Sequence, residues 1–171
     1  MTAIFPFPPQ PVTARRQLRE AAVAALVNAG LVVGTAAVSV DSPGDWPYPQ
    51  ASLPAVCVRT GNENKQPLGK KIPDFTTTVE LDVRAAVSAT TGEAAQDALE
   101  ALWFQVEQAI LTDFYTLQLV QRVSSESTVV ITSEGQVHMA GQIGHFRLET
   151  FETFDISVPA ATLTAPTAAS P

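Results

Sequence analysis

The sequence predicts an α+β fold: a largely antiparallel or mixed β-sheet with two main helices packed on one face. Two helical patterns are each followed by a run of strand patterns, so the order is helix, strands, helix, strands. That order lacks the regular alternation of strand and helix that a doubly wound parallel sheet requires. The chain has 171 residues, of which 46% are hydrophobic, and this is enough for one domain with a buried core.

The first helix is predicted over residues 14–29. Thr13 is a suitable N-cap, and Gly30 stands where a left-handed C-terminal cap is expected. Small apolar residues recur at spacings of three and four, which gives this helix a face that packs closely on a sheet. Its first turn and a half carries three arginines: Arg15, Arg16 and Arg19. The helix dipole disfavours positive charge there, so they form either a solvated cluster or a contact with an acidic partner.

The second helix begins at a capping box formed by Thr90 and Glu93, in which each side chain satisfies a free backbone donor. Four apolar residues then make one stripe along the helix: Leu99, Leu102, Val106 and Ile110. Trp103 and Phe104 widen the apolar sector beyond what one contact with a sheet needs. They belong either to the core or to a subunit interface, where aromatic residues concentrate.

Strand patterns fill the rest of the domain. In chain order they cover residues 53–60, 76–87, 117–123 and 127–132, a segment around Val137 and Met139, and residues 145–158. Val79, Leu81 and Val83 face one way and are expected to pack against the helical stripe. In the last strand two polar residues, Thr150 and Glu152, interrupt the apolar positions, and Phe151 points to the opposite face. This indicates a bulge, or two halves in different environments.

Residues 61–74 are predicted to form a long loop between two strands. A hairpin connection usually takes about 2–5 residues, so a loop of this length is either functional or ordered only on binding. All the lysines of the chain lie in it: Lys65, Lys70 and Lys71. A basic tip on an acidic protein fits contact with an acidic protein surface or with passing nucleic acid.

The two ends of the chain differ in composition from the domain, which covers residues 13–158. Residues 1–12 are a proline-rich extended arm with four prolines and no charged side chain, and residues 159–171 are a flexible tail rich in Ala, Thr and Pro. Ile4, Phe5 and Phe7 are poor choices for a solvated tail, so the arm is expected to pack on its own or a neighbouring subunit. Recognition of its P-x-x-P matches by another protein is the weaker alternative.

Charge and cysteine content exclude several classes of protein. Ten basic residues against 17 acidic ones give a net charge of −7, which excludes binding of duplex nucleic acid over the whole surface. The one cysteine, Cys57, excludes an internal disulfide and a multi-cysteine metal site. Neither a membrane-spanning helix nor a signal peptide is predicted, so the protein is expected to work in the cytoplasm or to leave it inside a larger particle.

The sequence also lacks the motifs of common enzymes. No dinucleotide-binding glycine motif and no nucleophile elbow occurs. Residues 61–71 lack both the first glycine and the final Ser or Thr of a phosphate-binding loop. The histidines, His138 and His145, have no ligand-rich neighbourhood in the sequence and are expected to bind no metal. We therefore expect a protein that is not an enzyme and has no cofactor.

The layout resembles the tail terminator, or tail completion, proteins of long-tailed bacteriophages and gene transfer agents. The features that carry the resemblance are, in chain order, the helix RRQLREAAVAAL, the segment DSPGDWPYPQ, the strand LPAVCVRT, the long loop, the strand FTTTVELDVRA, the helix EAAQDALEALWFQVEQAIL and the aromatic strand IGHFRLETFETFDISV. The resemblance covers residues 13–158. It lies in the order of elements and in short patterns, without one diagnostic motif, and the two terminal segments depart from it.

The resemblance implies a subunit that assembles as a hexameric ring on the last ring of the tail tube. The ring stops polymerisation and offers the surface to which the head joins through connector or stopper proteins, while DNA crosses the lumen without specific binding. It implies a place in the virion neck after assembly in the host cytoplasm, with no membrane contact. Lys65, Lys70 and Lys71 become contacts to the tube or neck, and Trp103, Phe104 and Phe151 become subunit contacts. The alternatives are another connector, stopper or minor tail component, or a small soluble protein-binding module.

Overall fold

A computed structural model describes residues 13–41, 52–70, 74–134 and 137–153. In chain order the elements are α1 (Ala14–Ala29), β1 (Val32–Val33), β2 (Ala36–Ala37), β3 (Ser39–Asp41), β4 (Ala55–Pro67), β5 (Asp74–Ala89), α2 (Gly92–Thr112), α3 (Phe114–Leu119), β6 (Arg122–Glu134) and β7 (Val137–Thr153). The proline-rich arm, the tail and strand residues 154–158 lie outside the described residues.

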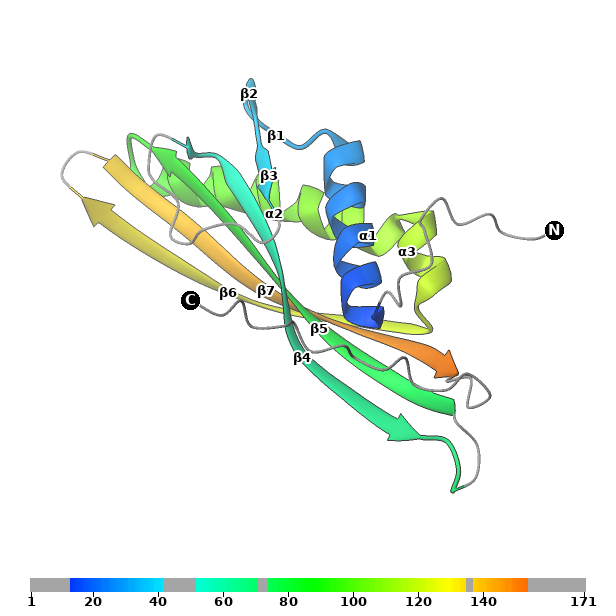
Figure 1. Cartoon of the computed structure of the whole chain (residues 1–171). Coiled ribbons are helices and arrows are strands. Elements are labelled where there is room, and N and C mark those ends of the chain that lie inside the picture. The colour runs from blue at the N-terminus through cyan, green and yellow to red at the C-terminus, as the bar shows by residue number, and fades with distance from the viewer. Residues whose placement is uncertain (1–12, 42–51, 71–73, 135–136, 154–171) are drawn as a thin grey trace, which may run out of the picture.

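The main sheet has five strands in the order β3-β4-β5-β7-β6. All its neighbours are antiparallel except β3 and β4, and β1 and β2 form a separate antiparallel pair. The helices lie on one side of the sheet, and the β4–β5 hairpin extends beyond them (Figure 1). The predicted α+β class, with a mixed but largely antiparallel sheet, is confirmed.

The first helix has the predicted limits and both predicted caps. The Thr13 side chain accepts a hydrogen bond from the Arg16 backbone N–H, and Gly30 has a φ of 61°. This left-handed conformation suits glycine, because a Cβ disfavours it. The apolar face of α1 is buried, with Leu18 and Leu26 inside the core.

The second helix starts one residue later than the predicted capping box. Thr91, and not Thr90, is the N-cap, because its side chain accepts from the Ala94 N–H at 3.2 Å. The predicted stripe is buried, and it belongs to the same core cluster as Val79, Leu81 and Val83 of β5. The predicted contact between this helix and the sheet is therefore confirmed.

The predicted loop over residues 61–74 is wrong in its extent. Residues 61–67 continue β4 and pair with β5 down to Pro67 opposite Phe75, which leaves residues 68–73 as the connection. A bulge between Thr60 and Glu63 changes which side chains face the helices. The polar run after the bulge gave no hydrophobic alternation, so the strand was not visible in the sequence.

Two other strand predictions need correction. Residues 114–119, which overlap the strand predicted at 117–123, form α3 instead. The last described strand, β7, starts at Val137 and pairs with β5 without interruption up to Thr153, so it has no bulge. The other alternative, two halves in different environments, agrees with the structure: Phe146 and Leu148 lie in the hydrophobic core, whereas Glu152 contacts Lys65 and Thr77.

Candidate interaction surface

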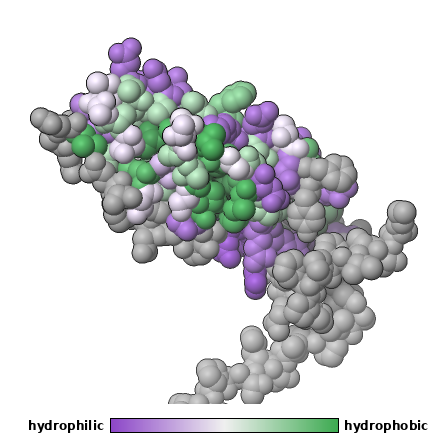
Figure 2. Space-filling model, turned by 90° about the horizontal axis from the view of Figure 1, so that it is seen from above, coloured by the Kyte–Doolittle hydropathy of each residue, from purple (hydrophilic) through white to green (hydrophobic). Residues whose placement is uncertain are grey.

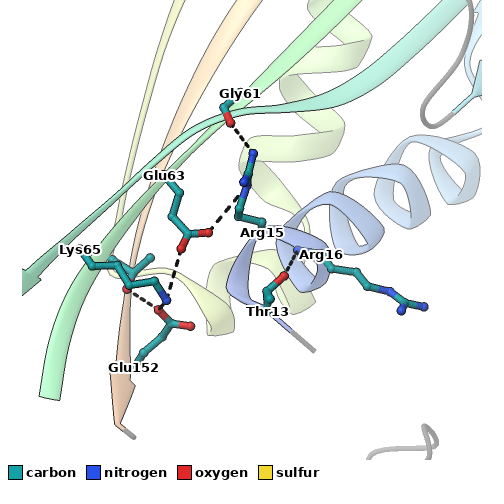
Figure 3. Close-up of polar contacts among 8 residues, drawn as sticks. Thr13, Arg15, Arg16, Gly61, Glu63, Lys65 and Glu152 are labelled. Carbon is teal, nitrogen blue, oxygen red and sulfur yellow. Dashed lines mark hydrogen bonds and ion pairs between the residues drawn. The ribbon is translucent and has the colours of Figure 1, made fainter. Parts of the chain in front are cut away.

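A polar cluster joins the start of α1 to the β4–β5 hairpin (Figure 3). Lys65 contacts the carboxylates of Glu152 and, at 3.3 Å, Glu63. Arg15 of α1 donates to the carbonyl oxygen of Gly61 at 2.8 Å and lies 3.7 Å from Glu63. The Thr77 hydroxyl also donates to Glu152. We call Arg15, Glu63, Lys65, Thr77 and Glu152 the helix–hairpin cluster.

The cluster exists because α1 has no acidic residue in its own first turn. The sheet supplies the negative charge instead: Glu152 of β7 accepts from the backbone N–H of Ala14, at the positive end of the helix. The bulge in β4 brings Glu63 and Lys65 onto the face that α1 covers, since they pair with the inward-facing Val79 and Thr77. The polar interruption in the last strand is thus the anchor of the first helix.

The pKa values of the central pair reflect this environment. Burial alone raises the pKa of Glu152, but hydrogen bonds from Lys65 and Thr77, the Lys65 charge and the Ala14 N–H lower it below its ordinary value. Burial alone lowers the pKa of Lys65, but hydrogen bonds to Glu152 and Glu63 and their charges raise it above its ordinary value. Both groups are therefore held in their charged forms.

These contacts change the interpretation of the lysines. Lys65 lies in a strand and pairs with two carboxylates of its own chain, so it holds the hairpin to the domain. Lys70 is exposed near the end of the hairpin, and Lys71 lies outside the described residues. Two of the three arginines of α1 are also paired internally, Arg15 with Glu63 and Arg16 with Glu20 at 2.7 Å. Lys65 therefore has partners within its own chain, whereas the contact role of Lys70 and Lys71 stays a prediction.

The three aromatic residues proposed for a subunit interface lie in different places. Trp103 is 5% exposed and packs against Phe146, with ring centroids 6.1 Å apart, so it belongs to the core. Phe104 of α2 and Phe151 of β7 are 67% and 53% exposed. Phe151 pairs with Thr76, whose neighbour Thr77 faces inward, so Phe151 projects from the face away from the helices. Phe104 and Phe151 remain available to a partner, but on opposite sides of the sheet.

An apolar hollow lies at the far end of α1 from the helix–hairpin cluster. It is lined by Leu26, Val27, Leu31, Val32, Ala37 and Val38, together with Gly30 and Val40, and has a volume of about 230 Å³. Val27 and Val32 on its rim are 57% and 46% exposed. Hydrophobic residues gather on this side of the molecule when it is seen from above (Figure 2). The sequence prediction missed this hollow, because it depends on how β1, β2 and β3 fold back on α1.

A side-chain amide fixes one wall of the hollow to α2. Gln105 donates to the Val32 carbonyl oxygen at 2.8 Å and accepts from the Val32 N–H at 3.1 Å. The Gln105 side chain therefore hydrogen-bonds to both the N–H and the C=O of Val32, as the backbone of a neighbouring strand would. It holds β1 beside the helix that carries Phe104.

The outer face of the sheet brings His145 to two carboxylates, which the sequence prediction did not foresee. His145 Nδ1 lies 2.7 Å from Asp82 Oδ1 and 3.7 Å from Glu80 Oε1, and Arg147 Nε lies 3.4 Å from Glu80 Oε2. The potential ligand atoms of Glu80, Asp82 and His145 lie within 4.8 Å of one another, which is the geometry a cation would need. Because Asp82 is directly opposite His145 and Glu80 opposite Arg147, pairing across strands explains the group.

The two edges of the sheet are unlike. Among the described strands, β6 pairs with β7 on one side and with no strand on the other. It is 13 residues long, contains no proline and exposes Val129 and Val130. The opposite edge is covered by β3 only at Ala55–Cys57, and β4 then carries the bulge, three charged residues (Arg59, Glu63 and Lys65) and Pro67. Bulges, charges and proline blunt an edge, so β4 offers a shorter stretch for pairing than β6 does.

Comparisons with known proteins show no family for this chain. No family model matches it, and no curated protein matches it. A solved structure described as "Virion of native gene transfer agent (GTA) particle" contains a similar chain, with a TM-score of 0.34 and 16% identity over 74% of this chain and 84% of that chain. A likeness at this TM-score supports no conclusion about fold or function. In the described part of the chain, no helix is long and apolar enough to cross a membrane.

Proposed function

We propose that this chain is a structural protein of the neck of a long-tailed phage or gene transfer agent. In this proposal it is a tail terminator: six copies form a ring that caps the tail tube, stops its polymerisation and presents the surface to which the head joins. The resemblance of residues 13–158 to that family is the starting point. The mechanism is steric and requires no catalytic step, and the net charge of −7 favours passage of DNA without adhesion.

The observation that carries the proposal is the asymmetry of the sheet edges. The four long strands alternate in direction, so β4 and β6 run in opposite directions. A second copy placed by rotation about a ring axis therefore presents its β4 antiparallel to the β6 of the first copy. A contact between two different surfaces gives a ring when the repeated rotation closes and an open filament when it does not, and in this proposal it closes after six copies. The bulge and Pro67 confine that pairing to a short stretch of β4, which keeps the two edges in register.

The remaining exposed groups have roles on the faces of the ring. The hairpin extends beyond the helical layer, and Lys70 lies exposed near its end (Figure 1). We propose Lys70 and its neighbour in the sequence, Lys71, as contacts to the tube or to a connector protein. Phe104 and Phe151 are proposed as apolar contacts on the two sides of the sheet. Lys65 has a different role in this proposal: it sets the direction of the hairpin through Glu63 and Glu152.

The oligomeric state of the purified chain tests the ring. Light scattering after size exclusion is expected to give about six times the subunit mass of 18.1 kDa. Val130→Lys places a charge on the exposed β6 edge and is expected to shift the protein to the subunit mass without unfolding it. Leu117→Lys on α3 is the matched control, because Leu117 is similarly exposed, at 43% against 52% for Val130. A ring that survives Val130→Lys would exclude β6 from the contact.

Particle assembly tests the function itself. In cells that produce particles without this protein, tubes of uncontrolled length and unjoined heads are expected, because tube growth has no end when no capping ring occupies the tip. Normal tails joined to heads would refute the terminator role. If tube length is normal but heads stay unjoined, the protein is another connector or stopper. A chain that stays at the subunit mass at every concentration supports the remaining alternative, a small soluble binding module.

A further inference from the structure

The apolar hollow at the end of α1 is large enough to receive an aromatic side chain. Its volume of about 230 Å³ exceeds the roughly 150 Å³ of an apolar cavity known to bind benzene. Its rim residues Val27 and Val32 are about half exposed. Covering them removes apolar surface from water, which is the main favourable term in protein association.

The proline-rich arm has the chemistry to fill this hollow. Residues 1–12 carry no charged side chain, and Ile4, Phe5 and Phe7 stand before or among the four prolines. Prolines, and the residues that precede them, favour the polyproline II conformation, which has three residues per turn. In that conformation Ile4 and Phe7, three residues apart, would share one face. A segment restricted in this way loses little conformational entropy when it binds.

We propose that the arm of one copy inserts Phe7 into the hollow of a second copy, with Ile4 against the rim. This inference rests on the self-association proposed above. A second copy is favoured by distance. Leu26 lies 13 residues after Thr13, or about 20 Å along the helix at 1.5 Å per residue. Phe7 lies six residues before Thr13, a reach of about 19 Å at 3.1 Å per residue. If the arm folded back along its own α1, it would need its whole length to bring Phe7 level with Leu26. No residues would then remain for the turn in the chain at Thr13.

Cross-linking between distinguishable copies tests the insertion. Full-length Ile4→Cys, which keeps Phe7 and carries an affinity tag, is mixed with untagged Val32→Cys and oxidised under native conditions. A disulfide-linked pair of one tagged and one untagged chain is expected. Leu117→Cys replaces Val32→Cys in the matched control, and each single variant alone reports any reaction of the buried Cys57. Equal yield with Leu117→Cys would overturn the proposal. So would a link within one chain when both cysteines are on the same copy at high dilution.

The strength of self-association provides a second measurement. Phe7→Ala is expected to weaken it about tenfold to a hundredfold, while Phe7→Leu, which keeps an apolar side chain, retains most of it. An unchanged association with Phe7→Ala would overturn the inference. If the copies form normal rings but no arm-to-hollow link, the arm proposal fails and the ring stands. If the copies do not associate at any concentration, both fail.

Discussion

Replacing Gly144 by alanine should destabilise the protein through one added methyl group. Gly144 lies on the helix-facing side of β7, and an added Cβ would lie under 3.0 Å from two ring carbons of Trp103. Real Cβ atoms do not approach other atoms this closely, so either the ring or the strand has to move. Neither moves easily, because Trp103 is buried beside Phe146 and β7 is paired on both sides. Overpacking of this kind typically costs about 1–3 kcal/mol, and we expect a loss in that range.

Urea unfolding of Gly144→Ala and Gly92→Ala would measure the effect. The two variants make the same chemical change. At Gly92, the first residue of α2, the new Cβ meets His138 Nδ1 at 3.6 Å, an ordinary contact. Gly92→Ala is therefore expected to be neutral or to stabilise by up to about 1 kcal/mol, because alanine restricts the unfolded chain. A loss below about 0.5 kcal/mol for Gly144→Ala would refute the argument.

A double-mutant cycle would show whether Trp103 is the cause. Trp103→Phe makes room above Gly144, so the two substitutions together should cost less than the sum of their separate effects. Coupling between residues in contact typically amounts to about 0.5–3 kcal/mol. Additive effects would mean that alanine destabilises β7 for some other reason.

Three further predictions concern the packing of α2, the charge of Glu152 and the hydrogen bonds of Gln105 to β1. Leu102→Ala should cost about 2–5 kcal/mol in urea unfolding, because Leu102 is fully buried, whereas Phe104→Ala, two residues away and 67% exposed, should change stability by less than about 0.5 kcal/mol. Glu152→Gln should cost about 1 kcal/mol at neutral pH. Since folding lowers the pKa of Glu152 from 4.5, its contribution is present above that pH and is lost as the pH falls through the folded pKa, so the two unfolding curves should converge in acid. Gln105→Ala should leave the core intact but speed hydrogen exchange at the Val32 amide, because the Gln105 side chain is the acceptor for that N–H. Unchanged exchange at Val32 would mean that Gln105 does not hold β1 in place.

The local patterns of the sequence determined the two long helices, α1 and α2, and their apolar faces. The limits of α1 follow from Thr13 and Gly30, and the burial of Leu102 follows from its place in a stripe of 3.6-residue period. These features depend on residues within one or two turns, so they are legible before any tertiary contact is known. The clean alternation from Val79 to Val83 likewise identified the central strand of the sheet.

The tertiary structure decided which polar residues have structural partners. Glu152 and Lys65 lie 87 residues apart, and Asp82 and His145 lie 63 apart, so no local pattern links them. The second half of β4 was predicted as a loop because its own side chains are polar, and a polar strand has no hydrophobic period. Whether Trp103 belonged to the core or to an interface was also undecided in the sequence. Gly144, which lies on β7 and 41 positions later in the sequence, has no side chain, and this leaves room in the core for the Trp103 ring.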